Sequence, residues 1–152
     1  MLRTASLSRP IIESLYSEAL LLADEVRAAF ALRLGDVAEQ TDDMLRLALS
    51  SEGLKATTRM MHVLAWLLNQ RAYFTGELSD VQLRRHGRLP EDRPSRSEDL
   101  ALLEPATREL IEETIRLHRR IARLDRAWSE RFDAQPTVHN MHERLGRVLG
   151  SR

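Results

Sequence analysis

The sequence predicts an all-α protein, organised as an antiparallel three-helix bundle with a long central helix and a short or mobile C-terminal segment. Apolar residues make up 43% of the 152 residues, enough to fill a core, while glycine occurs only 6 times and aromatic residues account for 5%. A low glycine content favours helix over turn-rich β structure. Apolar positions recur three and four residues apart over long stretches, and no convincing strand-like alternation occurs.

The first predicted helix spans about residues 10–34. Ser8 is a candidate N-cap, which places Pro10 in the first turn, where a missing N–H costs little. Gly35 follows the last apolar position and is expected to end the helix. The apolar stripe of this helix comprises Ile12, Leu15, Ala19, Leu22, Val26 and Ala29, and is widened by Ile11, Leu20 and Phe30.

The second predicted helix spans about residues 41–75, with Thr41 as N-cap and Gly76 as terminator. Gly53 in its interior predicts a kink or a close packing contact. A seven-residue repeat contains Met44, Leu47, Ser51, Leu54, Thr58, Met61, Ala65, Leu68 and Ala72, and a second stripe contains Leu45, Leu49, Met60, Leu64, Leu67 and Phe74. A helix that is apolar on two sides must be covered on two sides. We expect the second stripe to meet the C-terminal segment or the second subunit of a homodimer.

A short helix is predicted at about residues 79–85, followed by an exposed loop at 87–97 that holds two prolines. The third long helix is predicted from Glu104-Pro105 to about Phe132. Its heptad positions are Leu103, Thr107, Leu110, Thr114, Leu117, Ile121, Leu124 and Trp128. The predicted domains are therefore a helical bundle at 1–132 and a C-terminal tail at 133–152, which forms one short helix or stays mobile.

Composition excludes several classes of protein. The chain has no cysteine, so disulfides and thiolate metal sites are absent, and 23 basic residues balance 23 acidic ones. No apolar signal core or membrane-spanning run is present, because Arg9 and Pro10 interrupt the N-terminus and the longest apolar stretch covers residues 60–68. We therefore expect a cytoplasmic protein without a membrane partner.

Catalytic signatures are also absent from the sequence. It contains no phosphate loop, no dinucleotide-binding glycine fingerprint, no nucleophile elbow and no inward-facing Glu-x-x-His pair of a di-iron bundle. The sequence predicts no enzyme, no catalytic residue, no cofactor and no metal. A metal- or ligand-binding bundle that uses His62, or His139 together with His142, remains as a third hypothesis.

Two groups of residues are candidates for contact with a partner. Five arginines of the third helix resemble a nucleic-acid-binding face, although pairs such as Glu112–Arg116 would instead make a solvated, salt-bridged surface. They are Arg116, Arg119, Arg120, Arg123 and Arg126. Within the very apolar second helix, polar side chains need partners, either on the first helix or on another protein. These embedded candidates, together with the aromatic ring between them, are Arg59, Trp66, Gln70 and Arg71.

Two blocks resemble the alphaproteobacterial family of the regulator of CtrA degradation, RcdA. The first has the pattern T-T-R-x-M-x-x-x-x-W-L-L-x-Q-R-A at residues 57–72, followed by Gly-Glu-Leu-Ser at 76–79. The second begins at Glu104-Pro105 and continues through residues 108–112, 116–118 and 123–125. The blocks are in the order typical of the family, with a similar loop between them, and they cover about residues 54–126.

The resemblance implies a three-helix bundle that forms a homodimer and acts as an adaptor. The family's best-known member helps to deliver cell-cycle regulators, including CtrA, to the ClpXP protease together with CpdR, a response-regulator-like protein, and PopA, a cyclic-di-GMP effector. The resulting hypothesis is a non-enzymatic adaptor in regulated proteolysis, with protein partners and no catalytic residues. The alternative is a nucleic-acid-binding or transcription-regulating module that uses the arginines of the third helix.

Overall fold

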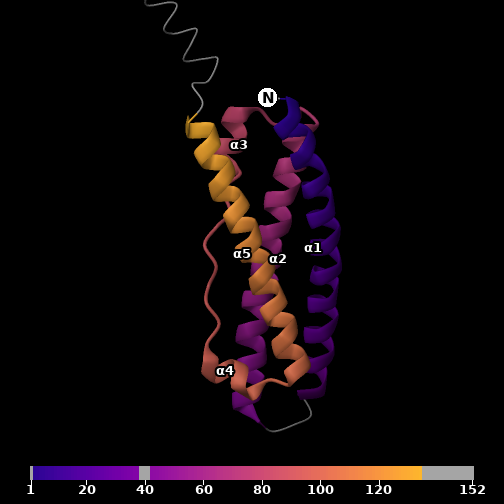
Figure 1. The fold of residues 1–152 in the computed structure, drawn as a ribbon. Coiled ribbons are helices and arrows are strands. Elements are labelled where there is room, and N and C mark those ends of the chain that lie inside the picture. Colours follow the sequence, from indigo (N-terminus) through magenta and orange to yellow (C-terminus); the bar gives the residue numbers. More distant parts are fainter. Residues whose placement is uncertain (1, 38–41, 135–152) are drawn as a thin grey trace, which may run out of the picture.

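The computed structural model describes residues 2–37 and 42–134 of the chain, with side chains described for residues 8–33 and 42–131. Within these ranges the structure has five helices and no strand, which confirms the all-α prediction. The helices are α1 (Leu2–Val37), α2 (Asp43–Phe74), α3 (Asp80–His86), α4 (Ser97–Leu102) and α5 (Pro105–Ala134), shown in Figure 1. None of the described helices is long and apolar enough to cross a membrane.

Helix α1 is longer than predicted at both ends. It begins at Leu2, passes through Pro10 and ends at Val37, so Ser8 is not its N-cap and Gly35 does not end it. Proline removes one backbone donor from the helix, and the helical turns on both sides of Pro10 persist despite that loss. The predicted apolar stripe faces the core, whereas Ile11 and Leu20 remain about half exposed.

Helix α2 begins and ends close to the predicted positions. Its N-cap is Asp42, whose carboxylate accepts hydrogen bonds from the N–H groups of Met44 at 3.1 Å and Leu45 at 3.3 Å. Thr41, the predicted N-cap, lies outside the described residues. At the other end Gly76 has a φ of 81°, a conformation that favours glycine, and the Glu77 N–H donates to the Ala72 carbonyl at 2.9 Å.

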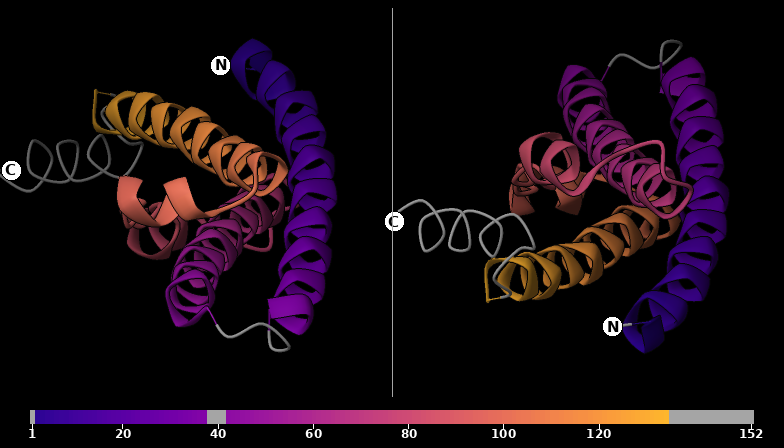
Figure 2. Two further views of the ribbon diagram at one scale, coloured as in Figure 1. Left: turned by 90° about the horizontal axis from the view of Figure 1, so that it is seen from below. Right: turned by 90° about the horizontal axis from the view of Figure 1, so that it is seen from above.

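Helix α1 runs antiparallel to α2 and α5. Arg71, near the end of α2, donates to Glu13 at 2.9 Å, and Arg120, in the second half of α5, donates to Glu18 at 2.8 Å. Both glutamates lie in the first half of α1. Figure 2 shows the three long helices around one centre, with α3 and α4 on the side of α2 and α5 that lies away from α1.

Helices α2 and α5 run parallel, which differs from the simple antiparallel bundle that the sequence predicts. Arg59 of α2 contacts Thr114 of α5, and Trp66, further along α2, contacts Asp125, further along α5. Two parallel helices cannot be joined by a short turn, because the chain must return along their length. Residues 87–96 make this return in an extended conformation (Figure 1).

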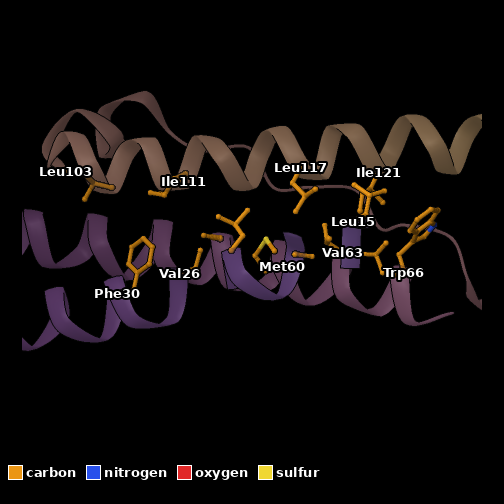
Figure 3. Close-up of a cluster of buried hydrophobic side chains, with 14 of the residues drawn as sticks. Leu15, Val26, Phe30, Met60, Val63, Trp66, Leu103, Ile111, Leu117 and Ile121 are labelled. Atoms are coloured by element: carbon orange, nitrogen blue, oxygen red, sulfur yellow. The ribbon is translucent and has the colours of Figure 1, made fainter. Parts of the chain in front are cut away.

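The core lies between the three long helices, as Figure 3 shows. Most of the second stripe of α2 faces this core, including Leu49, Met60 and Leu67, and therefore packs against α1 and α5. This corrects the expectation that the second stripe would meet the C-terminal segment or another subunit. The seven-residue repeat is the uncovered side of α2, with Leu47 and Leu54 more than two-thirds exposed.

The shorter elements match the sequence pattern only in part. Helix α3 has a capping box, in which the Gln82 N–H donates to the Ser79 hydroxyl and the Ser79 N–H donates to the Gln82 side chain. This confirms the short helix predicted there. Helix α4 was not predicted, because its six residues are too few to show a clear apolar period.

Gly53 marks a close approach between α1 and α2. A Cβ atom placed at this position would lie 2.7 Å from the Phe30 ring, closer than a real Cβ atom comes to its neighbours. Phe30 is itself buried in the core, so its ring has little room to move. The close-packing interpretation of Gly53 is therefore confirmed.

We predict that Gly53→Ala destabilises the protein, although alanine has the higher helix propensity. Overpacking a core typically costs about 1–3 kcal/mol, against about 1 kcal/mol gained in propensity. Denaturant unfolding measures the difference. The double variant Phe30→Leu/Gly53→Ala should lose less stability than the sum of the two single changes, because the smaller side chain makes room for the methyl group. Additive losses would contradict the steric explanation.

Candidate functional site: a buried polar seam and two exposed surfaces

Residues 87–96, here called the connecting segment, lie along α2 and α5 and are held there by buried polar side chains. Ten extended residues span about 33 Å, a length that brings the chain back past most of α2. The loop predicted at this position is therefore present. The loop was predicted to be exposed, but Gly87 is buried and Leu89, Asp92 and Ser95 are partly buried.

Arg59 is the central residue of this arrangement and is only 1% exposed. Its guanidinium donates to Asp92 Oδ2 at 2.7 Å, to Thr114 Oγ1 at 2.8 Å and to the carbonyl of Arg93 at 3.3 Å. The Thr114 hydroxyl in turn donates to the Ile111 carbonyl at 2.6 Å. A buried guanidinium needs a charged partner and satisfied hydrogen bonds, and Arg59 has both. It thereby links α2, α5 and the connecting segment.

Asp125 performs a similar role nearer the C-terminal ends of α2 and α5. Its Oδ1 accepts a hydrogen bond from the Trp66 indole at 3.0 Å, and its Oδ2 accepts one from the Leu89 N–H at 3.2 Å. The Arg88 guanidinium lies 3.5 Å from the same Oδ2. The Trp66 ring stacks on Trp128 with centroids 5.6 Å apart. Trp66 therefore fixes α5 both by packing and by a hydrogen bond.

Glu52 anchors the other end of the connecting segment and is fully buried. Its Oε1 accepts hydrogen bonds from Lys55 Nζ at 3.0 Å and from the Arg96 N–H at 3.1 Å. Its Oε2 and the buried Ser95 hydroxyl form no hydrogen bond of good geometry. The hydroxyl is nevertheless close enough to lower the pKa of the carboxyl. Burial by itself raises the pKa of Glu52, but Ser95, Lys55 and the Arg96 N–H together outweigh burial and lower it.

The three anchors on α2 lie seven residues apart, at Glu52, Arg59 and Trp66. Seven helical residues rise about 10.5 Å, which is the length of about three extended residues. The connecting segment therefore meets one anchor every three or four residues. His118 of α5 adds a contact between these points, because its Nε2 lies 3.2 Å from the Pro90 carbonyl. We call these anchors and their partners the polar seam.

The polar seam explains where several sequence candidates lie. Arg59 and Trp66 contact the chain itself, and Arg59 pairs with the connecting segment and α5 rather than with α1. Gln70 is also buried and lines a half-open cavity of about 140 Å³ among α2, α3 and α5. Arg71 pairs with Glu13 and lies 4.4 Å from the centre of the Tyr16 ring, so it has a partner on the first helix, one of the two alternatives expected for it.

Sequence reasoning missed Glu52, Asp92 and Asp125 as members of the polar seam. A signal was present in the sequence, since Glu52 and Arg59 are charged residues at heptad spacing on the core side of an apolar helix. The partners Asp92 and Asp125 gave no such signal. Each belongs to a different segment, and only the packing brings them beside α2.

The arginines of α5 form an exposed basic surface, here called the Arg face. It consists of Arg116, Arg119, Arg120, Arg123 and Arg126. No acidic residue of α5 is exposed between Glu113 and Glu130, since Asp125 points into the polar seam. The predicted Glu112–Arg116 ion pair is not formed. Among the described residues, the acidic partner of the Arg face is Glu18, which contacts Arg120.

The outer side of α2 is a second exposed surface, of opposite character. Between Leu47 and Leu68 its exposed residues are all uncharged. They are Leu47, Ser50, Leu54, Thr57, Met61, Ala65 and Leu68. We use the name outer stripe for the seven-residue repeat of α2. It includes five of these side chains, the exposed Met44 before them, and the partly buried Ser51, Thr58 and Ala72.

The described residues contain no group of three or more acidic or histidine side chains arranged to hold a metal ion. His62 is partly buried on α2, and His139 and His142 lie outside the part of the chain that the structure describes. Structurally, the chain is a helical scaffold with an internal polar seam and two chemically different exposed surfaces. It belongs to the family of proteins of unknown function DUF1465, whose model matches residues 3–149. No curated protein and no solved structure matches it.

We predict that Arg59→Met destabilises the protein by about 2–4 kcal/mol, because it removes the partner of a partly covered carboxylate and of the buried Thr114 hydroxyl. Urea unfolding measures the loss, and hydrogen exchange should show faster exchange in residues 87–96. The matched control is Arg71→Met, whose ion pair is 38% and 49% exposed, and which should cost about 1 kcal/mol or less. A larger loss for Arg71→Met than for Arg59→Met would contradict the proposed role.

The lowered pKa of Glu52 predicts a loss of stability in acid. The folded carboxyl holds its proton less tightly than an ordinary glutamate, so its contribution is fully present above pH 4.5 and is lost as pH falls through the lower folded pKa. Unfolding free energies measured from pH 6 to pH 2.5 should therefore fall less steeply for Glu52→Gln than for the unmodified protein. Curves that stay parallel below pH 4.5 would show that Glu52 is not responsible.

Proposed function

We propose that the protein is a non-enzymatic adaptor in regulated proteolysis, in which a three-helix bundle acts as the scaffold and two copies form a homodimer. The resemblance of residues 57–72 and 104–125 to the RcdA family supports this function and a cytoplasmic location. The observation that carries the proposal is the presence of two exposed surfaces on different helices. One is uncharged and apolar, and the other is strongly basic.

An adaptor acts by holding two proteins near each other. A rigid scaffold that binds a protease-bound partner and a substrate raises the local concentration of the substrate without any new chemistry. Surfaces of different chemistry suit this task because they select different partners. The Arg face is suited to an acidic protein surface, whose approach it accelerates electrostatically. The polar seam holds α5 in place and thereby presents the Arg face from a fixed backbone.

Reconstituted proteolysis tests this function. A mixture of ClpXP, a response-regulator-like partner and a cell-cycle substrate such as CtrA should degrade the substrate several-fold faster when the protein is added. Pull-down from a native lysate should recover ClpX or the receiver-domain partner. An unchanged degradation rate together with the absence of both proteins from the pull-down would reject the adaptor hypothesis.

The Arg face provides a sharper test. Arg119→Glu/Arg123→Glu should abolish most of the acceleration, because it replaces two exposed cations with anions at the proposed contact. The matched control is Arg9→Glu/Arg85→Glu, which changes two exposed arginines on α1 and α3 and gives the same change in net charge. If both double variants lose activity equally, the effect is one of net charge and the Arg face is not the contact.

The second candidate is a nucleic-acid-binding or transcription-regulating module that uses the Arg face. The observation that favours it is the lack of exposed acidic residues between Glu113 and Glu130 on α5. Phosphate binding releases counterions, so affinity for duplex DNA should fall steeply as salt rises from 50 to 200 mM, by about tenfold or more for the few contacts possible here. Fluorescence anisotropy measures this dependence. Binding that is absent at 50 mM salt excludes this candidate.

A further inference from the structure

The outer stripe of α2 is an apolar surface without a partner in the described chain. Leu47 is 72% exposed, Leu54 is 67% exposed and Met61 is 64% exposed. In a chain whose residues are 30% charged, about 22 residues of helix without one exposed charge are unusual. The stripe is about 38 Å long and about 10 Å wide, so its area of about 400 Å² lies in the range where exposed apolar patches mark a binding site.

The other helices and the connecting segment, as far as the structure describes them, leave this side of α2 uncovered. Helix α1 packs on the side of α2 that carries Gly53 and Arg71, as the Phe30 and Glu13 contacts show. The connecting segment packs on the side that carries Glu52 and Arg59. The outer stripe lies on the remaining side of the helix, opposite the core.

The size of the side chains in the outer stripe alternates regularly. Positions 47, 54, 61 and 68 carry Leu, Leu, Met and Leu, whereas positions 51, 58, 65 and 72 carry Ser, Thr, Ala and Ala. From residue 47 to residue 72, one heptad position is therefore always large and the other always small; Met44, at the start of the stripe, is a large residue at the otherwise small position. Small residues allow two helices to approach closely, and large residues fill the space between them when they face small ones.

This alternation matches itself when α2 pairs with a second α2 in the antiparallel direction. In a parallel pair, equivalent positions face each other, so large layers would alternate with layers that leave gaps. In an antiparallel pair, each large position faces a small one. One register pairs every position of the stripe from residue 47 to residue 72: Leu47 with Ala72, Ser51 with Leu68, Leu54 with Ala65, and Thr58 with Met61 of the second copy.

From this self-complementarity we propose that the outer stripe binds a second copy of this chain, with the two α2 helices antiparallel and a two-fold axis between Thr58 and Met61. The inference deepens the proposed function, on whose homodimer it rests, by assigning the interface, the direction and the register. If one helix of the pair is shifted by one heptad, Met44 of one copy faces Leu68 of the other. Two large residues then share one layer, so this shifted register packs less well. The interface is isologous, so it closes on itself and does not form fibres.

The first test is the mass in solution. Sedimentation of the full chain should give twice the 17.5 kDa of one copy. Leu54→Glu should weaken association at least tenfold, because it places two charges in the paired stripe. The matched control, Leu21→Glu, changes a leucine on α1 that is 70% exposed, against 67% for Leu54, and should leave the dimer unchanged. A monomer for the unmodified chain, or equal loss in both variants, overturns the proposal.

The second test is the direction of the pair, and the absence of cysteine from the sequence makes it simple. In the antiparallel register, positions 47 and 72 of different copies are adjacent, whereas position 47 lies about 38 Å from its own equivalent. A mixture of Leu47→Cys and Ala72→Cys chains should therefore form a disulfide-linked heterodimer, and Leu47→Cys alone should form no linked dimer. A linked dimer from Leu47→Cys alone shows a parallel pair and overturns the proposal.

These outcomes are distinguishable from a failure of the adaptor function. A protein that accelerates proteolysis as a monomer would refute the α2 pairing and the homodimer and leave the adaptor role intact. A dimer linked through Leu47→Cys and Ala72→Cys that has no effect on proteolysis would support the α2 pairing and refute the adaptor role. A third outcome is protection of the outer stripe by residues 135–152 of the same chain. In that case deletion of these residues converts a monomer into a dimer, which contradicts the pairing for the full chain.

Discussion

The buried guanidinium of Arg59 is the interaction on which the arrangement of this protein depends. Because α2 and α5 run parallel, residues 87–96 must return along both helices. An extended segment has no internal hydrogen bonds, so its backbone groups need partners from elsewhere. Arg59, Glu52 and Asp125 supply charged groups at the points where the segment crosses the helices. The position of α5, and with it the Arg face, follows from these contacts.

The same buried charges select one arrangement of the helices over another. Apolar stripes on α2 and α5 would pack in several registers, since leucines and isoleucines interchange at modest cost. Arg59 against Asp92 and Thr114, and Trp66 against Asp125, are satisfied in one register alone. A sliding of α5 by one turn would break the hydrogen bonds from Arg59 to Thr114 and from Trp66 to Asp125, and the buried polar groups left unpaired cost more than imperfect apolar packing.

The residues at 57–72 divide between the two sides of α2. Arg59 contacts the connecting segment and Trp66 contacts α5, so both maintain the fold, whereas Met61 and Leu68 are exposed on the outer stripe. One helix thus carries both the internal support of the scaffold and the surface that we propose for self-association. The exposed surfaces of α2 and α5 lie on different helices, and this separation allows both to be occupied at once.

The sequence by itself determined the all-α class, the approximate ends of α2 and the start of α5, because each depends on residues close in sequence or on helical periodicity. For Gly53 and Arg71 it offered two alternatives each, and the tertiary contacts with Phe30 and Glu13 decided between them. It also located two apolar stripes on α2. It did not determine which stripe faces the core, since both satisfy the same period. Only the tertiary structure decided this, along with the parallel direction of α5 and the partners of Glu52 and Arg59, because these depend on where residues 87–96 and α5 pack.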